Sequence, residues 1–471
     1  MANPEKLHPN TYPNRKSPYA TSAEEQEARQ ADTGAWFETL FTWLPGWIEQ
    51  FAQIPDPRQP GKVQHKLTVV LVYGVMLFLW QCGSRRAGNR ELTQPAVWET
   101  LQAAFPELDT IPHMDTVARV LERIPADQFE PILLDTIKRL LRNRRLTTWM
   151  VRHQYLVAVD GTLKWSADYP WALQALTKTL DGEKTLYQAY VLEAVLVGPQ
   201  GIAVPLLGEF CENVVDAPPE TKQDSELKAL YRLARRLKAA FPRLKITILA
   251  DGLYPNGPLF RFLRGLRWDF LIVLKAGNLK ALQAEARRLR RLVPENVYRT
   301  TWGDRTQAFW WVNDLEYEWH DPTTGRRCCT VLHYVVCEET WTDAEGEHTS
   351  TWGWVSARPL SKANVVDRCN RMARHRWDIE EHILTEKHYG YHYKHLYSRD
   401  WNGMQGFAAL LRLGHLLEIL ALHQTVLWPR VLERGIQGTI RWIWESIAGN
   451  WLDRAALAAR RPGPHRPRLI W

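Results

Sequence analysis

The sequence predicts an α/β protein built on a mixed β-sheet, with a helical region before the sheet and a β segment inserted into it. Residues 31–150 place their apolar side chains at helical spacing. Residues 151–296 alternate short apolar β-type runs with amphipathic helices. Residues 297–357 contain only β-like runs separated by polar turns, and helical spacing returns after them. These observations predict a mixed-sheet core that an antiparallel β insertion interrupts.

The first 150 residues divide into a tail and a helical domain. Residues 1–30 are polar with scattered prolines, and we expect a disordered tail. Within 31–150, the apolar run 67–80 is shorter than the ~20 residues that a bilayer-spanning helix needs, so it predicts a buried helix. The stretch 136–145 is rich in lysine and arginine and has no acidic residue. It is either a solvated helix face or part of a DNA-binding surface.

That basic stretch supplies three candidate DNA contacts, which are Arg142, Arg144 and Arg145. The chain has 60 Lys and Arg against 52 Asp and Glu, a net charge of +8 and a pI near 9.1. This balance excludes an acidic disordered chain and favours a polyanionic partner only weakly.

The core region orders its β-type runs and helices as a mixed sheet does. The apolar run 155–162 contains Asp160, and two further β-type runs are joined through residues 199–201 as a hairpin. An amphipathic helix follows, then the apolar run 246–252 with Asp251, then another helix and another strand. An antiparallel start followed by α/β alternation is the order expected of a ribonuclease-H-like fold.

The sequence from Ser361 onward, after the β insertion, predicts helices. From Ser361 onward helical spacing continues without a breaker until Gly390, and an apolar helix follows. We expect the catalytic core to comprise residues 151–296 and 358–425. Residues 426–471 form a helical C-terminal extension whose basic, proline-rich end we expect to be unstructured.

The cysteines and the N-terminus indicate the compartment. The chain has six cysteines and no CxxC pair, which disfavours both a zinc site and a disulfide scaffold. The N-terminus lacks the apolar stretch of a secretory signal. We therefore expect a cytoplasmic protein that does not associate with membranes.

Two aspartates are candidate metal ligands. Asp160 and Asp251 each stand at the C-terminal end of a predicted strand, so neighbouring strands would bring the carboxylates to one edge of the sheet. Two carboxylates repel each other unless a cation lies between them, and hard oxygen ligands select Mg²⁺ or Mn²⁺. Each aspartate alone could equally be a turn or capping residue.

A third carboxylate lies on a predicted helix between two cations. Arg376, Glu380 and Lys387 are spaced by four and seven residues, which places them on one helix face. An acid flanked by two cations suits a metal ligand with phosphate bound on either side. The alternative is an ordinary surface ion pair. Glu381 and Glu386 point elsewhere, and we expect both at the surface.

The segment HRWDIEEHILTEK resembles the YREK signature of the insertion sequence four family of DDE transposases. The signature is Tyr, two residues, Arg, three residues, Glu, six residues and Lys. The last three positions match Arg376, Glu380 and Lys387, whereas the tyrosine position is Ala373. The segment 352–360 resembles the strand before that helix, and IPDPRQPGKVQHKL resembles part of a domain found ahead of such catalytic regions. The likeness covers roughly residues 50 to 420.

The resemblance implies a DNA transposase, an endonuclease that mobilises an insertion sequence by metal-dependent cut-and-paste with hairpin ends. Asp160 would bridge two Mg²⁺ or Mn²⁺ ions, and Asp251 and Glu380 would each hold one. The partners would be double-stranded DNA, namely the terminal inverted repeats and the target, bound by a homodimer at the bacterial nucleoid. Trp352 occupies the family position of a tryptophan that stacks on a flipped base. It could instead be a core residue, and Trp354 should share its face.

Two other functions remain open from the sequence. A ribonuclease-H-like nuclease or resolvase would share the three acids without joining DNA, and a non-catalytic relative would only bind DNA. The histidine-rich stretch 388–395 favours a polar DNA-facing patch with Lys394 as a phosphate contact, and metal binding is the alternative. The inverted repeat and target sequences cannot be derived from the protein sequence.

Overall fold

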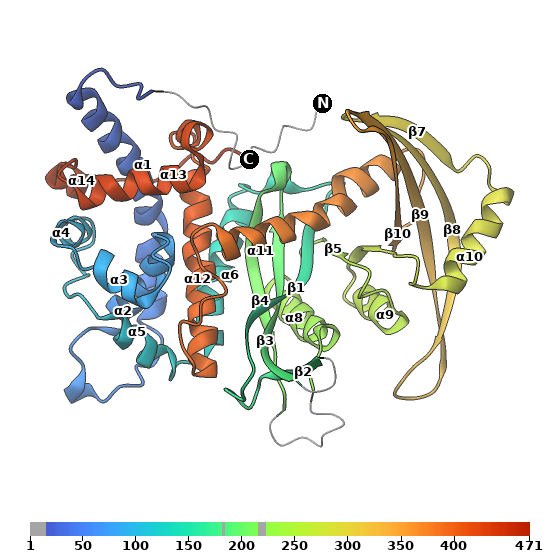
Figure 1. Cartoon of the computed structure of the whole chain (residues 1–471), viewed down its shortest axis with the longest axis horizontal. Helices are drawn as coiled ribbons and strands as arrows, with labels where there is room; N and C mark the ends of the chain where they lie inside the picture. The colour runs from blue at the N-terminus through green and yellow to red at the C-terminus, as the bar shows by residue number, and fades with distance from the viewer. Residues whose placement is uncertain (1–15, 181–183, 215–222) are drawn as a thin grey trace.

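The computed structural model describes residues 16–180, 184–214 and 223–471. Helices gather at one end of the molecule, a sheet occupies the middle, and the sheet continues into long strands at the other end (Figure 1). This is a mixed α/β structure with a helical N-terminal region, as the sequence predicts.

The N-terminal region consists of helices packed on a shared apolar core. Its helices are α1 (Ser22–Phe51), η1 (Pro60–Lys62), α2 (Leu67–Leu79), α3 (Arg85–Glu91), α4 (Pro95–Ala104), α5 (Met114–Leu121), η2 (Ala126–Phe129), α6 (Glu130–Arg142) and η3 (Thr147–Trp149). All residues of α2 except Thr68 are buried, which confirms the expected buried helix. The expectation of disorder is wrong for residues 22–30, because they belong to α1, which Thr21 caps by accepting from the backbone N–H of Glu24. Residues 1–15 lie outside the described residues.

One ten-stranded sheet runs through the rest of the chain. Its strands are β1 (Tyr155–Ala167), β2 (Leu176–Leu180), β3 (Lys184–Val197), β4 (Ala203–Cys211), β5 (Ile246–Ala250), β6 (Asp269–Val273), β7 (Val297–Trp302), β8 (Arg305–His320), β9 (Arg327–Asp343) and β10 (Gly346–Ser356). The order is β2-β3-β1-β5-β6-β10-β9-β8-β7, and β4 also pairs with β3.

The core strands combine both pairing directions. β3 lies antiparallel to β1 and β4 antiparallel to β3, and the short turn η4 (Pro199–Gly201) joins β3 to β4 as the predicted hairpin. β1, β5 and β6 run parallel to one another. The carboxyl ends of these three strands therefore lie at one edge, where sheets with parallel strands commonly place their functional groups.

The β insertion continues this sheet. β7, β8, β9 and β10 pair antiparallel in succession, and β10 then pairs antiparallel with β6. The antiparallel insertion that the sequence predicts is present, and its last strand adds directly to the core. Because the two strands are antiparallel, the chain leaves β10 beside the amino end of β6, where the backbone N–H of Ala357 donates to the carbonyl of Phe270.

Helices cover both faces of the core sheet. On one face, Val157 and Ile248 belong to the apolar core formed with α8 (Glu226–Ala240) and α9 (Gly257–Gly265). On the other face, Leu156 and Leu249 pack in a second core with residues that follow β10. α10 (Lys280–Leu289) and the turn η5 (Arg290–Leu292) contact β8.

The segment after β10 is helical but not one continuous helix. A wide π turn, η6 (Asp367–Met372), is followed by a tight 3₁₀ turn, η7 (Ala373–Trp377), and only then by α11 (Asp378–His388). The continuous helix expected from the absence of Gly and Pro is therefore wrong. α11 ends shortly before Gly390, whose positive φ of 99° suits glycine, so the histidine-rich stretch does not continue the helix.

The C-terminal region packs on the N-terminal helices. It contains α12 (Trp401–Leu422), α13 (Trp428–Ala448) and α14 (Arg454–Arg460). Among the described residues, α12 alone is long and apolar enough to cross a membrane, and 89% of its apolar window is buried inside the protein. The expected unstructured end instead folds back, since Leu469 bridges to Gln424 and the ring of Trp471 lies edge-on against Trp149.

Candidate active site

Two of the predicted metal ligands stand on neighbouring parallel strands. Asp160 lies on β1, and Asp251 directly follows β5. The parallel pairing includes Ala158 beside Leu249, and each aspartate lies two residues further along its strand. The two carboxylates therefore reach the same level of the sheet edge. Asp160 lies within its strand and not at its end, because β1 continues to residue 167 through its pairing with β3.

The electrostatics of Asp160 show that acidic groups converge on it. Burial raises the pKa of Asp160 to about 6, and the negative charges of Glu380 and Asp251 add to this effect. Arg376 and the backbone N–H of Gly161 act in the opposite direction. The three predicted carboxylates thus face one another closely enough to disfavour simultaneous ionisation without a cation.

Glu380 and Asp251 each face a cation. The Glu380 carboxylate pairs with Arg376 at 2.7 Å, and only 3% of the Arg376 side chain is exposed. Arg376 lies in the turn η7 before α11, with its guanidinium 3.7 Å from the centre of the Trp377 ring. Asp251 accepts from the backbone N–H of Leu253 at 2.8 Å and pairs with Lys275 at 3.4 Å.

Lys387 also approaches the carboxylates. Burial and the nearby charge of Lys394 lower the pKa of Lys387, whereas the charges of Asp160 and Glu386 raise it. Lys394 is exposed in the segment after α11. The structure therefore places Lys387 near the charge of Asp160 and places Lys394 near Lys387. At the departing signature position, Ala373 is buried in the second apolar core and offers no polar group.

Trp352 is half-buried on β10, and hydrogen bonds hold its ring in place. Its indole N–H lies 3.2 Å from Glu339 and 3.2 Å from the hydroxyl of Ser350. Its ring stacks near Trp354 with the centres 6.4 Å apart, which confirms that the two share a face. Trp354 is only 2% exposed and is a core residue. Trp352 is therefore the more accessible of the two.

Sequence reasoning missed a second aromatic side chain at this place. Trp377 is 40% exposed and meets the ring of Trp352 edge-on, with the centres 6.0 Å apart. It is adjacent to Arg376 and three residues before Glu380. Its position directly after Arg376 could have identified Trp377 from the sequence. The presence of 23 tryptophans in the chain makes any single one hard to select.

Sequence reasoning also missed a fourth carboxylate. Ser225 caps α8, and the first residue of that helix, Glu226, accepts a hydrogen bond from the hydroxyl of Tyr254 at 2.8 Å. A side chain at Gly161 would clash with this carboxyl group, because a Cβ there would lie 2.4–2.7 Å from its atoms. The glycine after Asp160 therefore leaves room for the Glu226 carboxyl group next to the sheet edge that carries Asp160. Gly161 lies within β1 and not in a turn.

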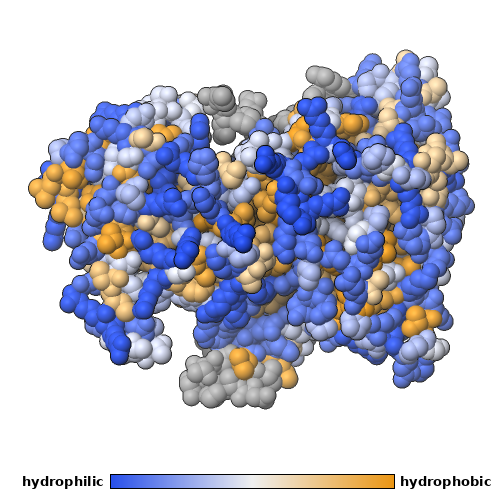
Figure 2. Space-filling view, turned by 180° about the vertical axis from the view of Figure 1, so that it is seen from behind, coloured by the Kyte–Doolittle hydropathy of each residue, from blue (hydrophilic) through white to orange (hydrophobic). Residues whose placement is uncertain are grey.

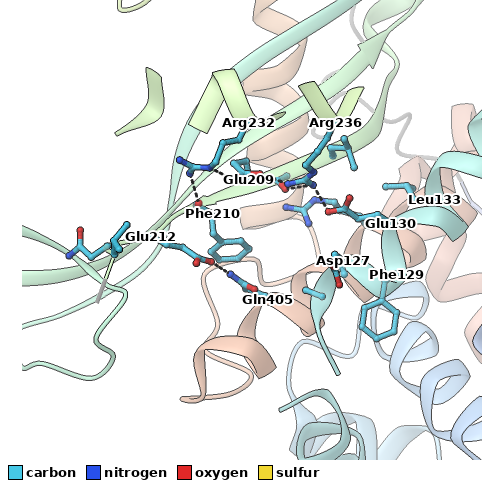
Figure 3. A pocket seen from close by; sticks show the side chains of 17 residues that line it. Asp127, Phe129, Glu130, Leu133, Glu209, Phe210, Glu212, Arg232, Arg236 and Gln405 are labelled. Carbon is cyan, nitrogen blue, oxygen red and sulfur yellow. Dashed lines mark hydrogen bonds and ion pairs between the residues drawn. The ribbon is translucent and has the colours of Figure 1, made fainter. Parts of the chain in front are cut away.

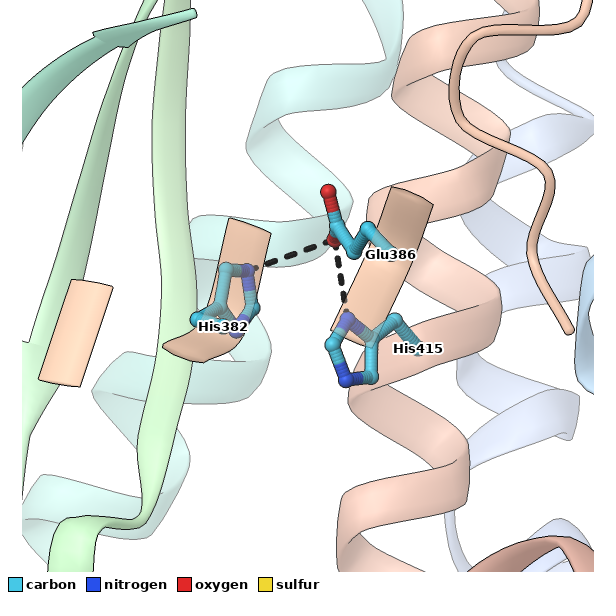
Figure 4. A group of neighbouring side chains, drawn as sticks. All are labelled: His382, Glu386 and His415. Carbon is cyan, nitrogen blue, oxygen red and sulfur yellow. Dashed lines mark hydrogen bonds and ion pairs between the residues drawn. The ribbon is translucent and has the colours of Figure 1, made fainter. Parts of the chain in front are cut away.

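Glu386 is a correction to the sequence analysis. It was expected at the surface, but its side chain is only 2% exposed, and it accepts hydrogen bonds from His382 and His415 on α11 and α12 (Figure 4). Burial raises the pKa of Glu386, but the two imidazoles outweigh this effect and hold it well below its usual range. The donor atoms of these three residues lie within 4.8 Å of one another, a donor set that could also hold a metal ion.

A buried lysine lies beside this group. Lys164 is on β1, four residues after Asp160, and donates to the backbone carbonyl of Tyr393 at 2.5 Å. Burial lowers the pKa of Lys164 to about 7, while the negative charge of Glu386 acts in the opposite direction. Strand β1, which carries Asp160, and helix α11, which carries Glu380, are thus also connected through buried polar groups.

A separate cavity of about 430 Å³ lies between α6, β4, α8 and α12 (Figure 3). Its charged side chains already pair with one another. Arg232 bonds to Glu209 and Asp224, and Arg236 bonds to Glu209 and Glu130. Because these arginines and carboxylates already pair with one another, they are less available to bind a charged ligand than the carboxylates near Asp160 are.

The three basic residues predicted from the N-terminal region lie elsewhere. Arg142 ends α6, and Arg144 and Arg145 follow it, all exposed. α6 lies among the helices next to α12, away from the β insertion (Figure 1). Among the described residues, none of these three arginines forms an ion pair with Asp160, Asp251 or Glu380.

Comparison with known families decides the class of protein. A family model described as Transposase DDE domain matches residues 202–417, which contain Asp251 and Glu380. A second model, described as DDE_Tnp_1-associated, matches residues 48–137. The chain is a DDE-type transposase. The search of curated proteins found no match.

This family assignment gives the coarse function. As a DDE transposase the chain is an enzyme of the transposase and nuclease class, it binds DNA, and it uses divalent metal ions. The match to the transposase domain begins at residue 202, so Asp160 lies outside the matched residues. Its position beside Asp251 comes from the pairing of β1 with β5.

Proposed function

We propose that this transposase moves an insertion sequence by cutting DNA at the ends of the element and joining the freed ends to target DNA, as members of the insertion sequence four family do. The strand order β4-β3-β1-β5-β6, with β3 antiparallel to β1 and with β5 and β6 parallel to it, supports a ribonuclease-H-like core. The spacing of Arg376, Glu380 and Lys387 supports the YREK relationship, and Ala373 departs from it.

The observation that carries the proposal is the convergence of three carboxylates from separate elements. Asp160, Asp251 and Glu380 come from β1, from the end of β5 and from α11, and the burial and mutual charge of the group raise the pKa of Asp160. A carboxyl group whose pKa is raised by burial and by neighbouring acids is typical of a functional site.

The donor set fits two Mg²⁺ or Mn²⁺ ions. The ligands are hard carboxylate oxygens, and a cation would offset both the burial and the carboxylate repulsion that raise the pKa of Asp160. Asp160 would contact both ions, and Asp251 and Glu380 would each hold one. When bound, such ions polarise the scissile phosphate and assist the attacking and leaving oxygens.

The cationic residues position the acids and the DNA backbone. Arg376 is almost fully buried against Glu380, so its role in the free protein is to fix the orientation of that carboxylate. Lys387 lies near Asp160, Lys394 lies near Lys387, and the two lysines would bind the phosphates on either side of the cut. Arg142, Arg144 and Arg145 would contact DNA farther along, through the N-terminal helices.

Trp352 and Trp377 would bind a base that is flipped out of the DNA duplex. A freed 3′-OH that attacks the opposite strand forms a tight hairpin, and removing one base from the stack relieves its strain. The half-buried Trp352 ring is held by Glu339, while the exposed Trp377 ring stands beside it. This pair would supply an aromatic pocket for the flipped base.

Two ends of an element must be joined to one target, so we expect two copies of the chain in the DNA complex, acting on DNA of the bacterial nucleoid. The decisive experiment incubates the protein with Mg²⁺ and DNA carrying the ends of its own element, and resolves the strands on a denaturing gel. The proposal predicts nicked, hairpin and joined products. Cleavage without joining would indicate a nuclease or resolvase, and binding without cleavage would indicate a non-catalytic relative.

A further inference from the structure

The end of α10 carries a dense group of arginines outside the catalytic edge. Arg287, Arg288, Arg290 and Arg291 occur within five consecutive residues, at the last turn of α10 and in η5. This arginine cluster lies on the outside of the β insertion, beside β8 (Figure 1). Seen from behind, the surface is mostly hydrophilic, with a hydrophobic area at the edge of the molecule that the β insertion forms (Figure 2).

Three of these arginines are unused by the fold. Arg287, Arg288 and Arg291 are exposed, and none forms a salt bridge with a carboxylate among the described residues. Arg290 differs, because its guanidinium lies 4.5 Å from the centre of the Trp310 ring and 3.8 Å from Glu338. The buried face of the helix consists of Leu282, Gln283 and Ala286. Packing therefore needs these last three residues and not the exposed arginines.

Elsewhere in this protein arginines are commonly paired. Arg232 bonds to two carboxylates, and Arg368 bonds to both oxygens of Asp269. Cations near a helix C-terminus are only weakly stabilised by the helix dipole, and neighbouring like charges oppose that stabilisation. Stability alone therefore does not explain three adjacent unpaired arginines.

The helix is firmly connected to the catalytic edge. The side chain of Asn278, just before α10, donates to the backbone carbonyl of Gly252 at 2.9 Å and accepts from the backbone N–H of Lys275 at 2.8 Å. Gln283 donates to the carbonyls of Lys275 and Asn278 at 2.9 and 2.6 Å. Gly252 follows Asp251, so the start of α10 is fixed against the loop that carries a proposed metal ligand.

We propose that the arginine cluster at the end of α10 is a second binding surface for the phosphate backbone of duplex DNA, used while the catalytic edge holds the cleavage site. The inference rests on the proposed transposase function. A ten-residue helix rises about 15 Å, and duplex DNA carries one charge per ~1.7 Å of its axis. DNA held at the catalytic edge therefore extends well past this distance. Exposed guanidinium groups bind phosphates through paired hydrogen bonds.

The test measures the salt dependence of DNA binding for a triple variant, Arg287→Gln with Arg288→Gln and Arg291→Gln. The probe is a labelled DNA duplex carrying the element's end. Each lost phosphate contact should reduce the slope of log affinity against log salt by about 0.9, so we expect a loss of about 2 to 3 in the slope. The matched control removes three exposed charges at scattered positions, Arg243→Gln with Lys245→Gln and Arg441→Gln. A triple Arg→Lys variant at α10 keeps the charge and should retain most of the slope.

The outcomes separate this inference from the proposed function. If the wild type cleaves and joins DNA but the α10 glutamine variant has the slope of the scattered control, the arginine cluster is not a DNA contact. If the wild type neither binds nor cuts end DNA, the proposed function fails first. Thermal melting of each variant excludes unfolding as the cause of weaker binding. Equal loss of slope in the α10 and scattered variants would also overturn the inference, since it would reflect overall charge alone.

Discussion

Two glutamates on α11, six residues apart, have opposite surroundings. The side chain of Glu380 is 39% exposed and pairs with a single arginine at the sheet edge. The side chain of Glu386 is 2% exposed, and one of its oxygens accepts from the imidazoles of two histidines. The helix thus presents one carboxylate to the catalytic edge and buries the other between itself and α12.

The difference teaches what makes a carboxylate available for chemistry. Glu380 keeps lone pairs that face Asp160 and solvent, so a cation or a DNA-bound ion can reach it. Glu386 is held by groups that also fix the position of α11, and its ionisation stabilises the fold only while the histidines remain. Residue type alone therefore does not distinguish a catalytic acid from an anchoring acid on this helix. The predictions below separate the two.

The largest expected effect is on strand cleavage. Asp160→Ala, Asp251→Ala and Glu380→Ala should each reduce cleavage by about a thousandfold or more, because each removes a proposed ligand worth several kcal/mol to the reaction. Gel-shift binding of end DNA should remain. The matched control is Glu381→Ala, the next residue on the helix. Normal cleavage by Glu380→Ala together with loss in Glu381→Ala would show that the helix register assigned here is wrong.

The second effect is on stability. Glu386→Ala leaves two buried imidazoles without their acceptor and should lower the free energy of unfolding by about 3–5 kcal/mol. Chemical denaturation of the variant and the wild type measures this change. Cleavage by the folded fraction should persist, in contrast to Glu380→Ala. An unchanged stability with abolished cleavage would place Glu386 in the catalytic machinery instead.

The third effect is confined to one step. Trp352→Ala should slow hairpin formation by about ten- to a hundredfold, since stacking a base on an aromatic ring is worth ~1–3 kcal/mol. The first nick should change little because the base is still stacked in the duplex. A time course resolves nicked, hairpin and fully cut products. Equal loss of all products with poor solubility would make Trp352 a core residue, as Trp354→Ala is expected to behave.

The smallest effect is a pH dependence. Because the pKa of Asp160 is raised to about 6, the folded protein binds this proton more tightly than the unfolded chain does. The contribution of Asp160 to stability is therefore largest at low pH and falls as the pH rises through about 6. A metal ion must displace the proton, so Mn²⁺ affinity should fall by about tenfold per pH unit below 6. Calorimetric titrations at several pH values measure this, and a flat profile from pH 5 to 7 would contradict the assignment.

Local pattern was sufficient to predict much of the fold and to propose the three acids as metal ligands. Alternating apolar runs indicated the strands that carry Asp160 and Asp251, and four-residue spacing indicated the pairing of Arg376 with Glu380. These features depend on residues close together in the chain. The family match adds the transposase class but does not assign roles to individual residues.

The features that were missed depend on segments distant in sequence. Glu386 is buried because His415 on α12 packs against it, and no local pattern specifies that contact. Glu226 reaches the catalytic edge because a glycine on β1 leaves room for it. Trp377 becomes significant only through the ring of Trp352, which another strand supplies. Likewise, the break before α11 follows from packing and not from a glycine or proline.

The central claim is that the divalent ions bind between Asp160, Asp251 and Glu380. It is tested most directly by counting Mn²⁺ ions bound to the wild type and to two matched variants, Glu380→Gln and Glu386→Gln, in the presence of end DNA. The account predicts that Glu380→Gln loses at least one of the two bound Mn²⁺ ions and that folded Glu386→Gln retains both. Retained binding in Glu380→Gln with loss in Glu386→Gln would contradict it and would place the ion at His382, Glu386 and His415.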